Sequence, residues 1–160
     1  NEHPEMKLVI APHVVSDSHL REILDKVKRP CIRYTEATEE NVTQADCLII
    51  DCYGLLSSIY RYGEISYIGG GFGVGIHNVL EAAVYGIPVI FGPNNKKFRE
   101  AQHLLEQKGG FEVIGYDDFK RLMDKFLSDE AYLQQAGKAA GNYVNHNAGA
   151  LEKIMKDITL

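Results

Sequence analysis

Residues 65–75 read ISYIGGGFGVG, an apolar run followed directly by a loop with five glycines in seven positions. The run 65–68 predicts a β-strand, and residues 78–85, behind the loop, carry a helical pattern. We call residues 69–75 the glycine loop. A strand that turns through such a loop into a helix is typical of parallel α/β proteins.

The same alternation of strand and helix extends along the chain. Apolar runs predict further strands at 7–11, 31–34, 47–51, 88–91 and 111–114. Helical spacing predicts helices at 16–27, 55–61, 97–107, 117–127, 129–142 and 147–158. Strands that alternate with helices form right-handed βαβ units. We therefore predict an α/β fold with a doubly wound, Rossmann-like parallel sheet, covered on both faces.

The composition indicates one soluble globular domain over residues 1–160, with 45% hydrophobic and 24% charged residues. The formal charge is −5 and no dense Lys/Arg cluster occurs, so a nucleic-acid partner is not expected. No apolar run reaches the roughly 18 residues of a membrane span, and no signal peptide is recognisable. Three cysteines without C-x-x-C spacing predict small buried residues of a reducing compartment rather than disulfides or a zinc site.

In parallel α/β sheets, ligands bind outside the carboxyl ends of the strands. Four segments immediately follow predicted strands: residues 12–13, 51–55, 69–75 and 92–94. We expect them along one crevice. Asp51 is the acid at a strand end there, and from its position it serves equally well as a ligand contact or as a loop-orienting residue.

The glycine loop is suited to an anion. Few side chains cover its N–H groups, and a helix that starts behind it adds oriented donors, so phosphate is the expected ligand. The loop fits neither the G-x-G-x-x-G nor the G-x-x-x-x-G-K-[ST] pattern, which argues against a hydride-transfer cofactor and P-loop phosphoryl transfer. The alternative is a glycine turn that only lets a strand fold tightly into a helix.

Asn78 and Glu81 open the following helix with the three-residue spacing of a capping box. The same spacing places both side chains on one helix face, where a carboxylate could accept two hydrogen bonds from a ribose diol. Both interpretations fit the residues. No conventional catalytic motif is present, so the residues alone predict a protein that binds a phosphate-bearing ligand, most simply a nucleotide.

Three motifs are specific in combination: IGGGF at 68–72, GIHNVLEAA at 75–83 and GIPVIFGP at 86–93. Together with AP at 11–12, Asp51 with Gly54, and FREA at 98–101, they resemble the carboxyl-terminal half of bacterial 3-deoxy-D-manno-octulosonic acid (Kdo) transferases. The similarity spans residues 7–127. It implies a GT-B glycosyltransferase whose second domain, here residues 1–160, binds CMP-Kdo. The first domain, which holds the lipid A precursor acceptor, is absent from this chain.

The resemblance also implies the donor contacts. They correspond to Pro12, His13, Tyr53, Gly54, Leu55, Gly70, Gly71, Asn78, Val79, Leu80 and Glu81, with Glu81 expected on the ribose. Three positions depart from the family pattern: His13 replaces an arginine, Leu55 a glutamate and Ile76 a glycine. His13 carries less fixed charge than arginine near neutral pH.

The implied reaction is displacement at the anomeric carbon of CMP-Kdo by a sugar hydroxyl of the lipid A precursor, with CMP leaving. The general base belongs to the absent domain, so we expect no catalytic residue in this chain, no cofactor and no metal. The resemblance places the parent protein at the cytoplasmic face of the bacterial inner membrane, with its membrane anchor in the absent half. The alternatives are the donor domain of a GT-B enzyme that uses a UDP- or GDP-sugar, and a non-catalytic nucleotide-binding module.

Overall fold

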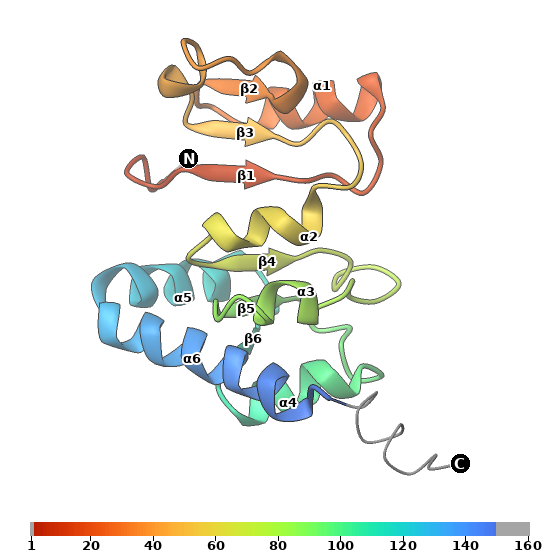
Figure 1. Ribbon diagram of the computed structural model, residues 1–160, viewed down its shortest axis with the longest axis vertical. Coiled ribbons are helices and arrows are strands. Elements are labelled where there is room, and N and C mark those ends of the chain that lie inside the picture. Colours follow the sequence, from red (N-terminus) through yellow and green to blue (C-terminus); the bar gives the residue numbers. More distant parts are fainter. Residues whose placement is uncertain (1, 150–160) are drawn as a thin grey trace. The chain divides into compact units, whose positions relative to one another are not determined.

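The computed structural model describes residues 2–149 (Figure 1). The chain divides into two compact units, Asn1–Ser58 and Ile59–Leu160, which we call the first and the second unit. Each contains one three-stranded sheet, and all strand pairs are parallel. No helix within residues 2–149 combines the length and the apolar character needed to cross a membrane.

The first unit has the sheet order β1-β3-β2, made of β1 (Leu8–Ile10), β3 (Cys47–Ile49) and β2 (Cys31–Arg33). Helix α1 (Asp17–Lys26) begins after Ser16, whose hydroxyl accepts a hydrogen bond from the His19 amide at 3.4 Å. The helix buries Leu20 against Cys47 and Ile49 of the central strand. Two short 3-10 helices, η1 (Tyr34–Glu36) and η2 (Val42–Gln44), lie between β2 and β3.

β1 is more exposed than a doubly covered strand would be. Leu8 and Val9 are 41% and 46% exposed, although their apolar run predicts burial. β1 is an edge strand of its sheet and pairs only with β3. An edge strand has neighbours along only one side, so its side chains are less completely covered.

The second unit has the sheet order β4-β5-β6, made of β4 (Ser66–Ile68), β5 (Val89–Phe91) and β6 (Gly110–Glu112). Its helices are α3 (Leu80–Ala83), α4 (Arg99–Glu106), α5 (Tyr116–Ser128) and α6 (Glu130–Asn147), and η3 (Tyr60–Tyr62) precedes the sheet. Helix α6 packs against α3, α4 and α5 (Figure 1). Helix α2 (Leu56–Ile59) lies where the first unit passes into the second.

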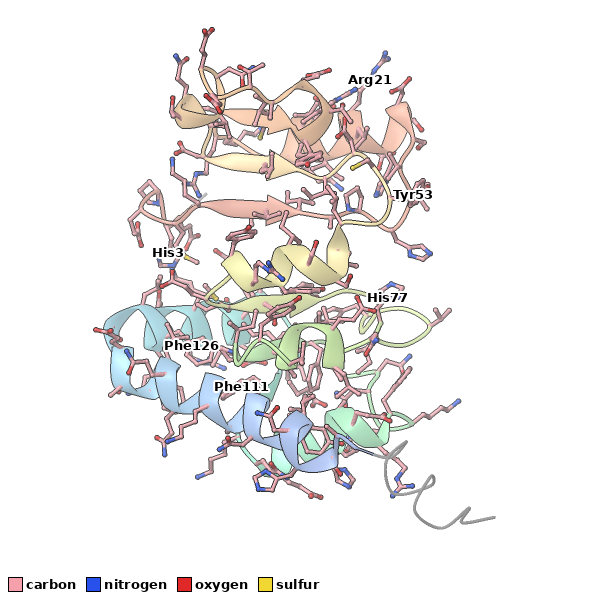
Figure 2. All side chains as sticks on the ribbon, in the orientation of Figure 1. His3, Arg21, Tyr53, His77, Phe111 and Phe126 are labelled. Carbon is pink, nitrogen blue, oxygen red and sulfur yellow. The ribbon has the colours of Figure 1, made fainter. Side chains whose placement is uncertain are left out.

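Both faces of this second sheet are covered by helices. On one face, Phe111 makes an edge contact at 5.1 Å with Phe126 of α5 (Figure 2), and Tyr67 does the same with Phe119 at 5.8 Å. On the other face, alternate strand residues such as Phe91 form a buried cluster with side chains of α3, α4 and α6. Parallel strands between two helical layers confirm the predicted α/β, Rossmann-like class.

One predicted helix is shorter in the structure, and another can be compared only in part. The helix expected at 78–85 is only the four-residue α3, because Gly86 adopts φ +70° and packs against α6: a Cβ on Gly137 of that helix would lie 2.3 Å from the Gly86 carbonyl oxygen. Most of the helix expected at 147–158 lies outside the described residues.

Candidate functional site

The candidate site of the second unit lies at the carboxyl ends of β4 and β5. The glycine loop follows β4, and residues 92–94, which we call the Asn94 turn, follow the neighbouring strand β5. The two segments are in contact: the Asn94 amide donates to the Gly71 carbonyl at 2.9 Å, and the Asn94 side chain donates to the Gly73 carbonyl at 2.6 Å. The prediction that these two segments share one edge is confirmed within this unit.

Close backbone packing requires two of the loop glycines. Gly70 has φ +87°, and a Cβ there would lie 2.2 Å from the Gly75 carbonyl oxygen. Gly71 is buried, and a Cβ on it would lie 2.5 Å from the Gly92 amide nitrogen. Packing alone therefore accounts for glycine at both positions. A tight turn and a ligand site are compatible, because the same packing keeps side chains away from the loop backbone.

Two backbone amides of the loop have no acceptor within the described protein. The amides of Gly73 and Gly75 donate to the Gly70 carbonyl at 2.9 and 3.2 Å, which closes the loop on itself. Within residues 2–149, the amides of Gly71 and Phe72 have no protein acceptor. Such backbone donors are suited to a phosphate. The helix dipole contributes less than the sequence predicts, because α3 is short and begins five residues after the loop.

Asn78 and Glu81 lie together, but they do not form a full capping box. The Asn78 side-chain oxygen Oδ1 accepts from the Leu80 amide at 3.0 Å, so Asn78 satisfies one donor at the helix start. Its amide group donates to the Glu81 carboxylate at 3.0 Å. Glu81 thus bonds to a side chain instead of reaching back to the backbone. Its second carboxylate oxygen remains able to accept hydrogen bonds.

The two residues between them face inward. Val79 is 3% exposed within the core, and Leu80 packs against the same core cluster. A ligand could therefore meet Val79 only through its backbone, whereas the Leu80 side chain is only partly buried. Burial and then the charge of Glu81 raise the pKa of the Tyr60 hydroxyl above its ordinary value.

In the first unit, residues 12–13 follow β1 and residues 51–55 follow the adjacent strand β3, so both lie at the same sheet edge. His13 is exposed, and Pro12 and Leu55 are partly buried. Tyr53 is 78% exposed (Figure 2), and Gly54 has φ +92° with open space around its Cα. The structure thus brings these predicted residues to a strand-end edge, as the fold predicts.

Asp51 has a structural role in this edge. Its carboxylate accepts from the Thr35 amide at 3.0 Å and from the Thr35 hydroxyl at 2.6 Å. Burial opposes ionisation, but the Thr35 bonds outweigh it, and the pKa of Asp51 lies below its ordinary value. With both oxygens engaged, Asp51 orients the loop after β2. Of the two interpretations that the sequence left open, this contact supports the loop-orienting one.

Sequence reasoning missed a buried polar group beside the Asn94 turn. Asn95 is 1% exposed and bonds to Gly92, Gln102 and Glu112. Its position after a predicted strand was the one available signal. Within residues 2–149, no group of three or more His, Cys, Asp or Glu side chains is arranged to hold a metal ion.

Comparison with known proteins identifies related sequences. The chain is 32% identical over 125 residues to the 3-deoxy-D-manno-octulosonic acid transferase of Aquifex aeolicus, covering 77% of this chain and 34% of that protein. It is 28% identical over 149 residues to the transferase of the same name from Rickettsia felis, covering 88% of this chain and 31% of that protein. The chain spans about one third of the length of these curated relatives. No protein-family model matches it.

A solved structure supports the fold. The C-terminal CMP-Kdo binding domain of WaaA from Acinetobacter baumannii matches with a TM-score of 0.73 at 18% identity, over 90% of this chain and 76% of that one. A likeness at this identity shows the fold. Together with the curated relatives, it confirms the predicted resemblance to the carboxyl-terminal part of Kdo transferases.

Proposed function

Because the chain resembles Kdo transferases over most of its length, we propose that residues 1–160 form the CMP-Kdo-binding domain of a glycosyltransferase. The whole protein would transfer Kdo to a lipid A precursor in lipopolysaccharide biosynthesis. The observation that carries the proposal is the glycine loop with unused amides, followed in the chain by the Asn78–Glu81 pair. Both lie in the stretches that match the family motifs.

The glycine loop and the Asn78–Glu81 pair would bind different parts of the nucleotide. The amides of Gly71 and Phe72 would donate to the phosphate of CMP, and no side chain would be needed there. The Glu81 carboxylate would accept from the two ribose hydroxyls. The Asn78 amide, which donates to the same carboxylate at 3.0 Å, would hold it in place.

The resemblance also implies donor contacts at Pro12, His13, Tyr53, Gly54 and Leu55. We propose these contacts from the resemblance, and two of the residues differ in chemistry from those usual in the family. A family arginine carries a permanent charge, whereas the imidazole of His13 does not. Leu55 offers an apolar side chain where the family has a carboxylate.

In the proposed reaction, an acceptor hydroxyl attacks the anomeric carbon and the bond to the CMP oxygen breaks. The loop amides would stabilise the negative charge that develops on the leaving phosphate. The base that removes the hydroxyl proton would belong to the domain that precedes this one in the relatives. We therefore propose that the 160-residue chain binds donor but transfers no Kdo, and that its parent acts at the cytoplasmic face of the inner membrane. Kdo transfer by the isolated chain, assayed with CMP-Kdo and a lipid A precursor, would disprove the first part.

Calorimetric titration of the chain with CMP, UDP and GDP tests the proposed ligand. The proposal requires that CMP bind more tightly than the other two. Tighter binding of UDP or GDP would instead indicate a GT-B enzyme with a different donor. No binding of any of the three nucleotides would contradict the proposed donor site.

A further inference from the structure

The Asn94 turn is the segment at this edge that the proposed function does not use. Asn94 makes two hydrogen bonds to the glycine loop, one from its backbone to Gly71 and one from its side chain to Gly73. These two carbonyls lie on either side of Phe72, whose amide is among those available to a ligand. Asn94 therefore holds the loop on both sides of the proposed phosphate contact.

The turn itself is anchored in the protein interior by Asn95. The Asn95 amide group donates to the Gly92 carbonyl at 2.9 Å and to the Glu112 carboxylate at 2.6 Å. Its carbonyl oxygen accepts from the Gln102 side chain at 2.6 Å. Every polar atom of this buried side chain is thus bonded, which favours a single conformation of the turn.

A third contact restrains the end of the loop. A Cβ on Gly75, where φ is +144°, would lie 3.0 Å from the ring of Phe98. The Phe98 amide in turn donates to the Asn95 carbonyl at 2.9 Å. The glycine loop is therefore fixed at three points by one segment, residues 94–98, which adjoins β5.

We propose that Asn94 is a positioning residue for donor binding, which fixes the glycine loop in the conformation that presents its amides to a phosphate. This inference rests on the proposed function. Asn94 would act through the loop, because its own donor groups are already used by Gly71 and Gly73. Preorganised donors bind an anion without first having to order themselves, so loss of the Asn94 side chain should weaken donor binding.

The test compares Asn94→Ala, Asn94→Asp and wild type in two measurements. NMR hydrogen exchange of the Gly73 and Gly75 amides reports loop order without any ligand, and calorimetry reports CMP affinity. Loss of one hydrogen bond should speed exchange about tenfold and weaken CMP binding about tenfold. Asn94→Asp should speed loop exchange as Asn94→Ala does, because a carboxylate cannot donate to the Gly73 carbonyl, and its added negative charge should weaken CMP binding further. Asn145→Ala, an exposed asparagine of α6, is the matched control and should change neither value.

The inference is overturned if loop exchange in Asn94→Ala equals that of wild type. It is also overturned if exchange rises while CMP affinity stays the same, since the loop conformation would then not matter for the donor. Failure of the proposed function appears differently: the wild-type chain would bind no CMP, while loop exchange would still depend on Asn94.

Discussion

Glu81→Ala tests the assignment of the ribose contact. A ribose diol that loses two hydrogen bonds to a carboxylate should bind more weakly by about 2–3 kcal/mol, about a 30- to 150-fold rise in the Kd for CMP. The cost to folding should be smaller. Within residues 2–149, the Glu81 carboxylate accepts one side-chain hydrogen bond, the exposed one from Asn78. We expect its loss to lower the free energy of unfolding by about 0.5–1 kcal/mol.

Calorimetry with CMP and denaturant unfolding separate these two effects. Glu64→Ala is a suitable control, because Glu64 is an exposed acid of the same unit and its removal changes the net charge equally. A stability loss of about 1 kcal/mol with unchanged CMP affinity would refute the ribose assignment and leave Glu81 a role at the helix start only.

A spectroscopic titration tests whether the Glu81 carboxylate lies near the Tyr60 hydroxyl. Burial and the Glu81 charge together hold the pKa of Tyr60 above its ordinary value. In Glu81→Gln, NMR titration of the Tyr60 ring should give a lower pKa for Tyr60 that is still raised by burial. An unchanged titration would place the carboxylate too far from Tyr60.

Three further predictions concern stability and reactivity. Gly71→Ala should lower the free energy of unfolding by about 1–3 kcal/mol in urea, because its Cβ would lie 2.5 Å from the Gly92 backbone, whereas Gly115→Ala, with open space, should change it little. Asp51 has a lowered pKa, so its stabilising contribution should be complete above its unfolded value of about 3.9 and be lost as pH falls through the folded value; Asp51→Asn should flatten that part of the stability profile. Burial, then the neighbouring thiol, raises the pKa of Cys47 to about 12, so mass spectrometry should find Cys47 unmodified by iodoacetamide at pH 8 until the protein unfolds.

The strands and their order along the chain could be predicted because apolar runs are separated by glycine, proline and polar segments. The predicted run at 65–68 becomes β4 and the run at 88–91 becomes β5, each within one residue at either end. The helix predicted at 16–27 becomes α1, and Ser16 caps it, since capping depends on residues only three apart. Local patterns were therefore sufficient wherever local contacts determine the structure.

The role of Asn95 could not be predicted from local sequence patterns. Its partner Glu112 lies 17 residues further along the chain, and the two meet only because β5 and β6 pair in parallel. The length of α3 has a similar cause, since Gly86 packs against Gly137 of α6. The Asn78–Glu81 pattern predicted a capping box, but the helix begins at Leu80, and the two side chains bond to each other instead.

The most direct test of the proposed donor site is a crystal structure of the chain soaked with CMP. We predict one bound nucleotide, whose phosphate accepts hydrogen bonds from the amides of Gly71 and Phe72 and whose ribose hydroxyls donate to the Glu81 carboxylate. Density for CMP away from the glycine loop, or no density at a concentration well above the measured Kd, would contradict it.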